Sequence, residues 1–357
     1  MKSKMSILWD DINQSIKRLD TQTNVFYGKH IVITGATGQI GQYLVNFLKR
    51  LNELGYGCTV DIVSRNVKHA MNLFGNCACL NYITHDFEQY GGGFNSSKPP
   101  DLIIAGASPT SPYAYNNVPV KVAQTNLNCT IQMLGLSKKY GSSILLLSSS
   151  SIYGSADDRE VHENDYGALD PLQVSACYSE SKRACEMLLS AYHHQFGIAT
   201  YIVRLRRIYG STMHLSQNSY LDTVFRAAAK GEALETFRDA ANKLQLTYIS
   251  DAVNGIVYVL SKGKVNLPYN ICANDLVTVD EFTAIAYETG KKYGMRLRYL
   301  EKENIRDSVR VNNQNRNNGR CLSEQLKSLG WQQEVTIRQG INRTILALRE
   351  TFDETER

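Results

Sequence analysis

The chain has 357 residues, enough to bury a large core and divide into two lobes, and 43% of them are hydrophobic and 20% charged, as in typical globular enzymes. The net charge of +5 is modest and no basic block occurs, so we expect no nucleic-acid partner. No apolar stretch approaches the roughly 20 residues of a membrane span, which excludes an integral membrane protein. The N-terminus turns acidic at Asp10, too early for a signal peptide. The eight cysteines lack paired metal-ligand spacing, so we expect no metal and free thiols in a cytoplasmic protein.

Residues 1–27 precede the first expected strand. Their apolar residues Leu8, Ile12, Ile16 and Leu19 recur at helical spacing. That spacing predicts an amphipathic helix that docks on the main body of the protein.

Strand and helix patterns alternate from residue 28 to about residue 205. We expect strands at 30–34, 58–63, 80–83, 101–105, 143–147 and near 199–205. We expect helices at 39–54, 66–73, 117–139 and 178–196. This alternation predicts an α/β fold with a Rossmann-type doubly wound parallel sheet. After about residue 209 the elements become shorter and more polar, which predicts a smaller, discontinuous C-terminal substrate lobe.

The turn between the first strand and the first helix of this alternation is rich in glycine. Gly35, Gly38 and Gly41 sit three apart, directly after the apolar run 30–34. Such a turn lets the backbone approach a pyrophosphate and aims helix-end N–H groups at its charge. The motif predicts dinucleotide binding, and a tight turn without a ligand is the alternative. The cofactor contacts expected here are Gly35, Thr37, Gly38, Gln39, Ile40 and Gly41.

A tyrosine and a lysine, Tyr178 and Lys182, lie one helical turn apart on the same face. Hydride transfer at a carbinol carbon needs a group that takes or supplies the hydroxyl proton. The tyrosine pKa of about 10 is too high for this at neutral pH, but a lysine ammonium and a positive nicotinamide would lower it. We therefore expect both residues to be catalytic and to contact the cofactor, with an exposed helix face as the alternative.

These motifs, together with the serine run 148–151 after an apolar strand, resemble the short-chain dehydrogenase/reductase superfamily. The resemblance is to its extended, nucleotide-sugar-modifying branch, the NAD-dependent epimerase/dehydratase family, and extends from about residue 28 to 331. Several segments are similar to the UDP-glucuronate decarboxylases: 101–112, 176–178 with 181–183, 248–251 and 329–331.

The resemblance implies a nucleotide-sugar substrate and further site residues. Counting back from Tyr153-Gly154 makes Ser149 the hydroxyl that positions the sugar oxygen, with a neighbouring serine as the alternative. Ala107 would contact the cofactor, and Ser108, Ser150 and Ser151 would contact the substrate. The domains we expect are a helical extension at 1–27, an NAD(P)-binding Rossmann domain at 28–208 plus 246–262, and a nucleotide-sugar-binding lobe at 209–245 plus 263–357.

Cofactor choice depends on the end of the second strand, where many relatives carry an acidic residue that binds the adenosine ribose. This chain has Ser64-Arg65 there. An arginine fork can bind a 2′-phosphate, so we favour NADP over NAD, with a solvated or adenine-stacked Arg65 as the alternative. Asp86 resembles the aspartate that contacts the adenine amino group, and a loop cap is its alternative role.

Three positions depart from the decarboxylase pattern. The glutamate that precedes the strand-end tyrosine–glycine in decarboxylases and 4,6-dehydratases is Ser151 here. The diphosphate-contacting asparagine aligns with Arg207, and the diphosphate arginine aligns with Leu244, next to Lys243. Further cationic candidates for the substrate diphosphate are Arg316 and Arg320.

These residues favour an NADP(H)-linked reductase of a nucleotide-linked 4-keto sugar, acting by hydride transfer at C4. The alternatives are an NAD-recycling 4-epimerase or UDP-glucuronate decarboxylase-like enzyme, and a cofactor-binding scaffold without turnover. The resemblance also implies a homodimer that pairs through the helices at 117–139 and 178–196. Its apolar surface would come from Val122, Met133, Leu134, Met187 and Leu188, unless these face the chain's own sheet.

Overall fold

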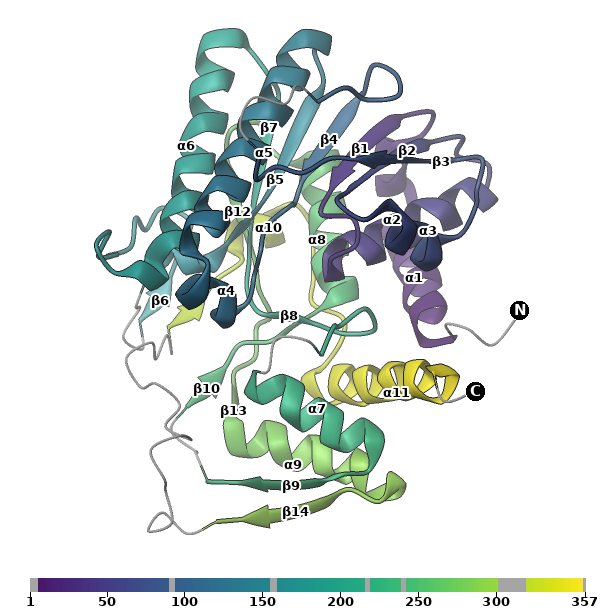
Figure 1. Ribbon diagram of the computed structural model, residues 1–357, viewed down its shortest axis with the longest axis vertical. Coiled ribbons are helices and arrows are strands. Elements are labelled where there is room, and N and C mark those ends of the chain that lie inside the picture. Colours follow the sequence, from purple (N-terminus) through teal and green to yellow (C-terminus); the bar gives the residue numbers. More distant parts are fainter. Residues whose placement is uncertain are drawn as a thin grey trace.

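Seven parallel strands form the central sheet of the computed structural model, which describes residues 6–89, 94–154, 159–215, 219–238, 242–300 and 319–355 (Figure 1). The strand order is β12-β7-β5-β4-β1-β2-β3. These strands are β1 (His30–Thr34), β2 (Thr59–Ser64), β3 (Leu80–Thr84), β4 (Leu102–Ala105), β5 (Ser143–Ser149), β7 (Thr200–Leu205) and β12 (Pro268–Ile271). All neighbouring pairs are parallel, which confirms the Rossmann-type doubly wound sheet predicted from the sequence.

Both faces of the sheet are buried, which is why its strands appear in the sequence as continuous apolar runs. On one face Ile31 and Ile33 of β1 belong to the same core cluster as Leu44. On the other face Val32 packs in a cluster with Met133. The helices that cover the sheet are α2 (Gln39–Glu53), α3 (Val67–Phe74), α5 (Pro119–Tyr140), α6 (Cys177–Phe196) and α8 (Ile249–Lys262).

The apolar residues that we expected at a dimer interface divide between core and surface. Val122, Met133 and Leu134 of α5 are completely buried within this chain, and Met133 and Leu134 pack in the core cluster on one face of the sheet. They are therefore unavailable to a second chain, and the prediction was wrong for them. Met187 of α6 is 58% exposed.

A smaller lobe lies below the sheet in Figure 1. It contains α7 (Tyr220–Lys230), β9 (Ala233–Thr236), α9 (Val279–Gly290) and β14 (Arg296–Tyr299). The helix α11 (Ile337–Thr355) packs against α7, α9 and α1. Outside the main sheet, two-residue strands also pair: β6 (Glu160–Val161) with β15 (Arg320–Cys321), β8 (Ile208–Tyr209) with β11 (Thr247–Tyr248), and β10 (Lys243–Leu244) with β13 (Val277–Thr278). Other short elements are α4 (Pro112–Asn117), α10 (Glu324–Ser328), η1 (Asp20–Phe26), η2 (Ser150–Tyr153), η3 (Val174–Ala176) and η4 (Lys291–Tyr293).

One strand corrects the expected domain boundaries. Residues 268–271 were assigned to the sugar-binding lobe, but they form β12 and pair with β7 along the edge of the main sheet. Asn270 and Ile271 are fully buried there, so this segment gains both hydrogen bonds and apolar burial by joining the sheet. The division of the remaining residues into lobes stays a proposal.

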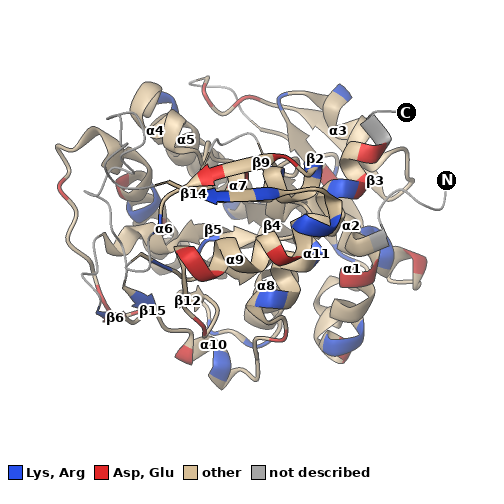
Figure 2. Cartoon of the chain, turned by 90° about the horizontal axis from the view of Figure 1, so that it is seen from below, with Lys and Arg blue, Asp and Glu red and all other residues tan. Residues whose placement is uncertain are grey.

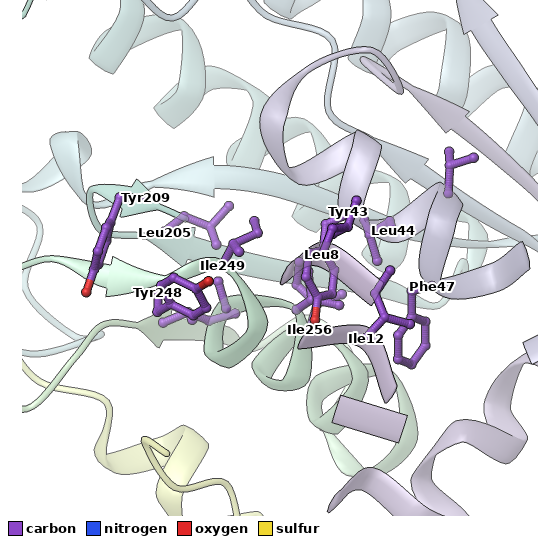
Figure 3. Packing of buried hydrophobic residues seen from close by; sticks show 14 of the residues in the cluster. Leu8, Ile12, Tyr43, Leu44, Phe47, Leu205, Tyr209, Tyr248, Ile249 and Ile256 are labelled. Atoms are coloured by element: carbon purple, nitrogen blue, oxygen red, sulfur yellow. The ribbon is translucent and has the colours of Figure 1, made fainter. Parts of the chain in front are cut away.

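The N-terminal segment forms the amphipathic helix α1 (Ser6–Leu19). Figure 3 shows Leu8 and Ile12 of this helix beside Tyr43 and Phe47 of α2. The side chains of Leu8 and Ile12 are buried almost completely. Burying a side chain of this size stabilises a fold by roughly 1.5–3 kcal/mol, so α1 is an integral part of the core.

A polar contact also holds α1 in place. The buried Asp11 carboxylate accepts hydrogen bonds from Arg343 Nε (2.7 Å), the Tyr248 hydroxyl (2.7 Å) and the Ser211 hydroxyl (2.8 Å). Burial raises the pKa of Asp11, and the positive charge of Arg343 opposes that rise. Asp11 therefore joins α1 to α11 and to the loop after β8.

In the view of Figure 2, acidic and basic residues are interspersed along the helices and strands rather than gathered in one region. None of the helices within the described ranges is long and apolar enough to cross a membrane.

Asp251, near the start of α8, anchors the segment that leads to α11. Its carboxylate accepts the N–H groups of Glu334 (3.2 Å) and Val335 (3.0 Å), and its carbonyl accepts Trp331 Nε1 (3.0 Å). Asp251 is 1% exposed, and burial raises its pKa to about 7, although the two N–H donors oppose the rise. The protonated form is therefore favoured by folding.

We expect the stability of the protein to depend on pH through Asp251. Because the pKa is higher in the folded chain, its stabilising contribution is complete below pH 4 and is lost as pH rises to about 7. A shift of this size corresponds to roughly 4 kcal/mol. Urea unfolding from pH 4 to 8 should show the stability of wild type falling relative to Asp251→Asn across this window. Asp275→Asn, at an exposed aspartate, is the control, and parallel pH profiles for wild type and Asp251→Asn would contradict the assignment.

Candidate active site

A cavity of about 1400 Å³ opens at the carboxyl ends of the parallel strands. Its walls come from the loops after β1, β2, β3, β4 and β5, from the start of α6, and from the segment after β7. Open parallel sheets bind ligands at this edge, because successive loops there point to opposite faces and leave a crevice between them. Seventeen of the predicted site residues line it: Gly35, Thr37, Gly38, Gln39, Ile40, Gly41, Ser64, Arg65, Asp86, Ala107, Ser108, Ser149, Ser150, Ser151, Tyr178, Lys182 and Arg207.

The glycine turn brings three backbone segments into direct contact. A Cβ atom on Gly35 would lie 2.5 Å from the Gly106 carbonyl oxygen, and one on Gly41 would lie 2.3 Å from the Gly35 oxygen. Gly38 precedes α2, where the first N–H groups of the helix have no earlier carbonyl to bond. A backbone surface with free N–H groups and no side chains fits the pyrophosphate of a nicotinamide dinucleotide.

The catalytic pair predicted from the sequence comes together at the end of β5. Lys182 is 3% exposed and its Nζ donates to the Leu147 carbonyl oxygen over 2.9 Å. The same Nζ atom lies 5.9 Å from the centre of the Tyr178 ring. Ser149 Oγ accepts the N–H of Ser151 at 3.1 Å, which leaves its own hydroxyl proton available to a ligand. This arrangement can hold a sugar hydroxyl and exchange a proton with it.

Sequence reasoning missed Tyr115 of α4. Its ring stacks on that of Tyr178, with ring centres 4.9 Å apart and planes inclined by 21°. Burial, followed by the neighbouring Tyr178, raises the pKa of Tyr115, so this phenol stays neutral beside Tyr178. Only two residues separate Tyr115 from the segment 101–112, which could have indicated it.

Sequence reasoning also missed a buried ion pair between Arg204 of β7 and Glu186 of α6. Arg204 Nη2 bonds Glu186 at 2.7 Å, and Arg204 Nη1 bonds the Tyr153 hydroxyl at 2.8 Å. Ser148 donates its hydroxyl proton to the same Glu186 carboxylate. Glu186 follows Lys182 by one helical turn, which was the available signal. The pair fixes the end of β5 against α6 and so sets the positions of Ser149 and Lys182.

The expected adenosine end of the cavity carries charges of both signs. Arg65 Nη1 lies 2.6 Å from a Glu88 carboxylate oxygen. Asp86 Oδ1 accepts the N–H of Glu88 at 3.0 Å, so Asp86 acts as a loop cap while also lining the cavity.

At the expected sugar end, Ser150, Ser151 and Arg207 also line the cavity. Arg207 has a positive φ of 40°, unusual for a residue with a side chain, and its side chain is exposed toward the cavity. The surrounding protein, and then the charge of Arg206, lower the pKa of Arg207 to about 10, so it remains cationic at neutral pH. An anionic group of a ligand would stabilise this charge.

Of the other cationic candidates, Lys243 and Arg320 are described, and neither lines the cavity. Lys243 lies exposed in β10. Arg320 bonds the Asn274 carbonyl at 3.0 Å and lies 3.4 Å from the Glu160 carboxylate. Arg316 falls outside the described residues.

Comparison with known proteins assigns the family. Residues 31–272 match the NAD dependent epimerase/dehydratase family, so the chain belongs to it. UDP-glucuronic acid decarboxylase 6 of Arabidopsis thaliana is 30% identical over 311 residues, covering 87% of this chain and 86% of that protein. UDP-glucose 4-epimerase of Thermotoga maritima has a TM-score of 0.72 at 20% identity, over 90% of this chain and 99% of that structure. UDP-glucuronic acid 4-epimerase of Bacillus cereus, solved with UDP-glucuronic acid and NAD, has a TM-score of 0.71 at 18% identity, over 90% and 99%.

Family membership confirms the class predicted from the motifs. The chain is an NAD(P)-dependent enzyme of the extended short-chain dehydrogenase/reductase branch that modifies nucleotide sugars.

The contacts at the glycine turn predict opposite effects for two Gly→Ala substitutions. Gly41→Ala places a methyl group against backbone atoms of Gly35 and Ala36, so it should cost about 1–3 kcal/mol and weaken dinucleotide binding. Gly135→Ala, within α5, meets nothing within 4 Å and should stabilise the fold by about 0.5–1 kcal/mol. Urea unfolding of both variants checks this, and equal tolerance at the two positions would show that the close approach is unimportant.

Proposed function

We propose that this enzyme is a 4-epimerase of a nucleotide-linked sugar that recycles a bound NAD. The observation that carries the proposal is the combination of Ser149, Tyr178 and Lys182 around one cavity with Ser151 at the position of the decarboxylase glutamate. The three residues support oxidation and reduction at C4. A serine hydroxyl without an activating partner is a poor base, so chemistry at C5 lacks support.

The residues of this chain divide the work at C4 between them. Ser149 holds the C4 oxygen, and Tyr178 takes the hydroxyl proton and later returns it. Lys182, fixed by the Leu147 carbonyl, holds the ribose of the nicotinamide and supplies positive charge beside Tyr178. A nicotinamide, when bound, would supply the acceptor and donor of the C4 hydride. Epimerisation requires that the 4-keto sugar present its other face before hydrogen returns, which the cavity of about 1400 Å³ leaves room for.

We infer that the sugar carries a nucleoside diphosphate and is a uronic acid. Two of the three proteins named above act on UDP-glucuronic acid or bind it by their own descriptions, and the third binds UDP-glucose. In this chain, Arg207 offers a cation to the cavity. A guanidinium can bind either a diphosphate or a carboxylate in a bidentate manner.

An NADPH-linked reductase of a 4-keto sugar is the second candidate. It is favoured by Arg65, a cation at the rim where many relatives carry an acid. It is disfavoured by Glu88, which already bonds that guanidinium over 2.6 Å. We therefore place NAD before NADP, the reverse of the order favoured by the sequence.

Turnover without added cofactor tests the epimerase proposal. Purified enzyme incubated with UDP-glucuronic acid should form its C4 epimer, as separated by chromatography, with no CO₂ release and no NADPH consumption. UDP-glucose and dTDP-glucose in parallel reactions test the preference for a uronic acid. Stoichiometric NADPH oxidation with a 4-keto sugar would identify the reductase instead, and CO₂ release would identify a decarboxylase.

The matched variant is Tyr178→Phe, which keeps the ring and its stacking but lacks the hydroxyl. Its rate should fall by about 10²–10⁴ while cofactor binding remains, because only proton transfer is lost. Tyr192→Phe, on the same helix but outside the residues that line the cavity, is the control. A Tyr178→Phe enzyme with normal turnover would remove the assignment, whatever the substrate.

We also propose a homodimer that pairs through α5 and α6. Ile131 is 46% exposed and Met187 58% exposed on these helices, which leaves apolar side chains without cover in a single chain. Sedimentation at micromolar concentration should give about twice the 40.1 kDa of one chain. The double variant Ile131→Glu/Met187→Glu should sediment as single chains, whereas Val265→Glu, at an exposed valine outside these helices, should not. A wild-type species of 40.1 kDa would contradict the proposal.

A further inference from the structure

Three charged side chains meet at the rim of the cavity where the adenosine ribose is expected. Arg65 follows β2, Glu88 follows β3, and Lys121 comes from the first turn of α5. Both Arg65 Nη1 and Lys121 Nζ lie 2.6 Å from the same carboxylate oxygen, Glu88 Oε1. Arg65 and Glu88 line the cavity itself.

Glu88 is the most enclosed member of this group, 27% exposed against 60% for the Arg65 side chain. Its position is set from two directions. Lys121 holds the carboxylate, and Asp86 Oδ1 accepts the backbone N–H of Glu88 at 3.0 Å. To leave Arg65, this carboxylate would also have to leave Lys121, because both cations bond the same oxygen.

The end of the second strand is where dinucleotide-binding sheets distinguish the two cofactors. An acidic side chain there binds the ribose hydroxyls of NAD, whereas an arginine accommodates the 2′-phosphate of NADP. This chain has the arginine at that strand end, but the next loop supplies a carboxylate that bonds it. Glu88 therefore occupies Arg65 Nη1, and the negative charge of Glu88 beside this guanidinium would repel a 2′-phosphate.

We propose that Glu88 is the specificity-determining residue that makes this enzyme select NAD over NADP, by occupying Arg65 and placing a negative charge beside the expected 2′-phosphate. The inference rests on dinucleotide binding alone and holds whether the sugar is epimerised, reduced or decarboxylated.

Cofactor exchange on the full-length protein tests the proposal without any sugar. Protein as purified is incubated to equilibrium with equal concentrations of NAD and NADP, and the bound nucleotides are separated and quantified. Wild type should retain mainly NAD. Glu88→Gln keeps the size of the side chain and removes its charge, so the bound NADP:NAD ratio should rise about tenfold, as expected when one charge-assisted contact is released.

Two further variants separate this role from a structural one. Adding Arg65→Ala to Glu88→Gln should abolish the gain, because Arg65 is the group that Glu88→Gln releases. Glu235→Gln makes the same change at the exposed Arg298–Glu235 pair of the smaller lobe and should leave the ratio at the wild-type value.

The proposal is overturned if Glu88→Gln leaves the ratio unchanged, or if it strengthens binding of both cofactors equally. It is also overturned if wild type already prefers NADP. If wild type retains mainly NAD and its variants change the NADP:NAD ratio as expected, but wild type shows no epimerase activity, the result counts against the proposed reaction only. Absence of either nucleotide from every variant would remove the dinucleotide site on which this inference depends.

Discussion

The structure depends first on a close approach of backbone at the glycine turn. The carbonyl oxygen of Gly35 faces the position that a Cβ of Gly41 would occupy, and Gly35 itself presses against Gly106 at the end of β4. These contacts bring β1, β4 and α2 nearer than any side chain would allow. The loops that line the cavity, the start of α2 and the neighbouring strand β5 are positioned around this point.

Buried polar contacts then join the side chains of α6 and β7 that lie near the cavity to the end of β5. Burying the Lys182 ammonium without a partner would be costly, and the Leu147 carbonyl offsets part of this cost by accepting a hydrogen bond from it. Arg204 and Glu186 satisfy each other, and through Ser148 and Tyr153 they reach both sides of the serine run. Because removing one partner of such a pair leaves an uncompensated buried charge, these contacts stabilise the position of the end of β5 against α6.

The N-terminal helix reaches the same site indirectly. Asp11 bonds Ser211, and the next residue, Thr212, donates its hydroxyl proton to the Gln39 carbonyl at the start of α2. His214 Nε2 of this loop lies 2.8 Å from Gln42 Nε2, so the loop that contacts α1 also contacts the first turn of α2, next to the glycine turn. The extension before the first strand is therefore connected to the cofactor cradle and to α11, which packs on the smaller lobe.

The sequence by itself determined the local structure and the class of enzyme. Runs such as Ile31–Ile33 identify strands buried on both faces, and the spacings of Gly35–Gly41 and Tyr178–Lys182 indicate the turn and the helical pair, because backbone geometry sets these periods. Tertiary structure alone decided which distant side chains meet. Glu88 reaches Arg65 because β3 lies beside β2, Tyr115 reaches Tyr178 across α4 and α6, and β12 joins the sheet far from its neighbours in sequence. Such contacts follow from strand order and helix docking, which no local period encodes.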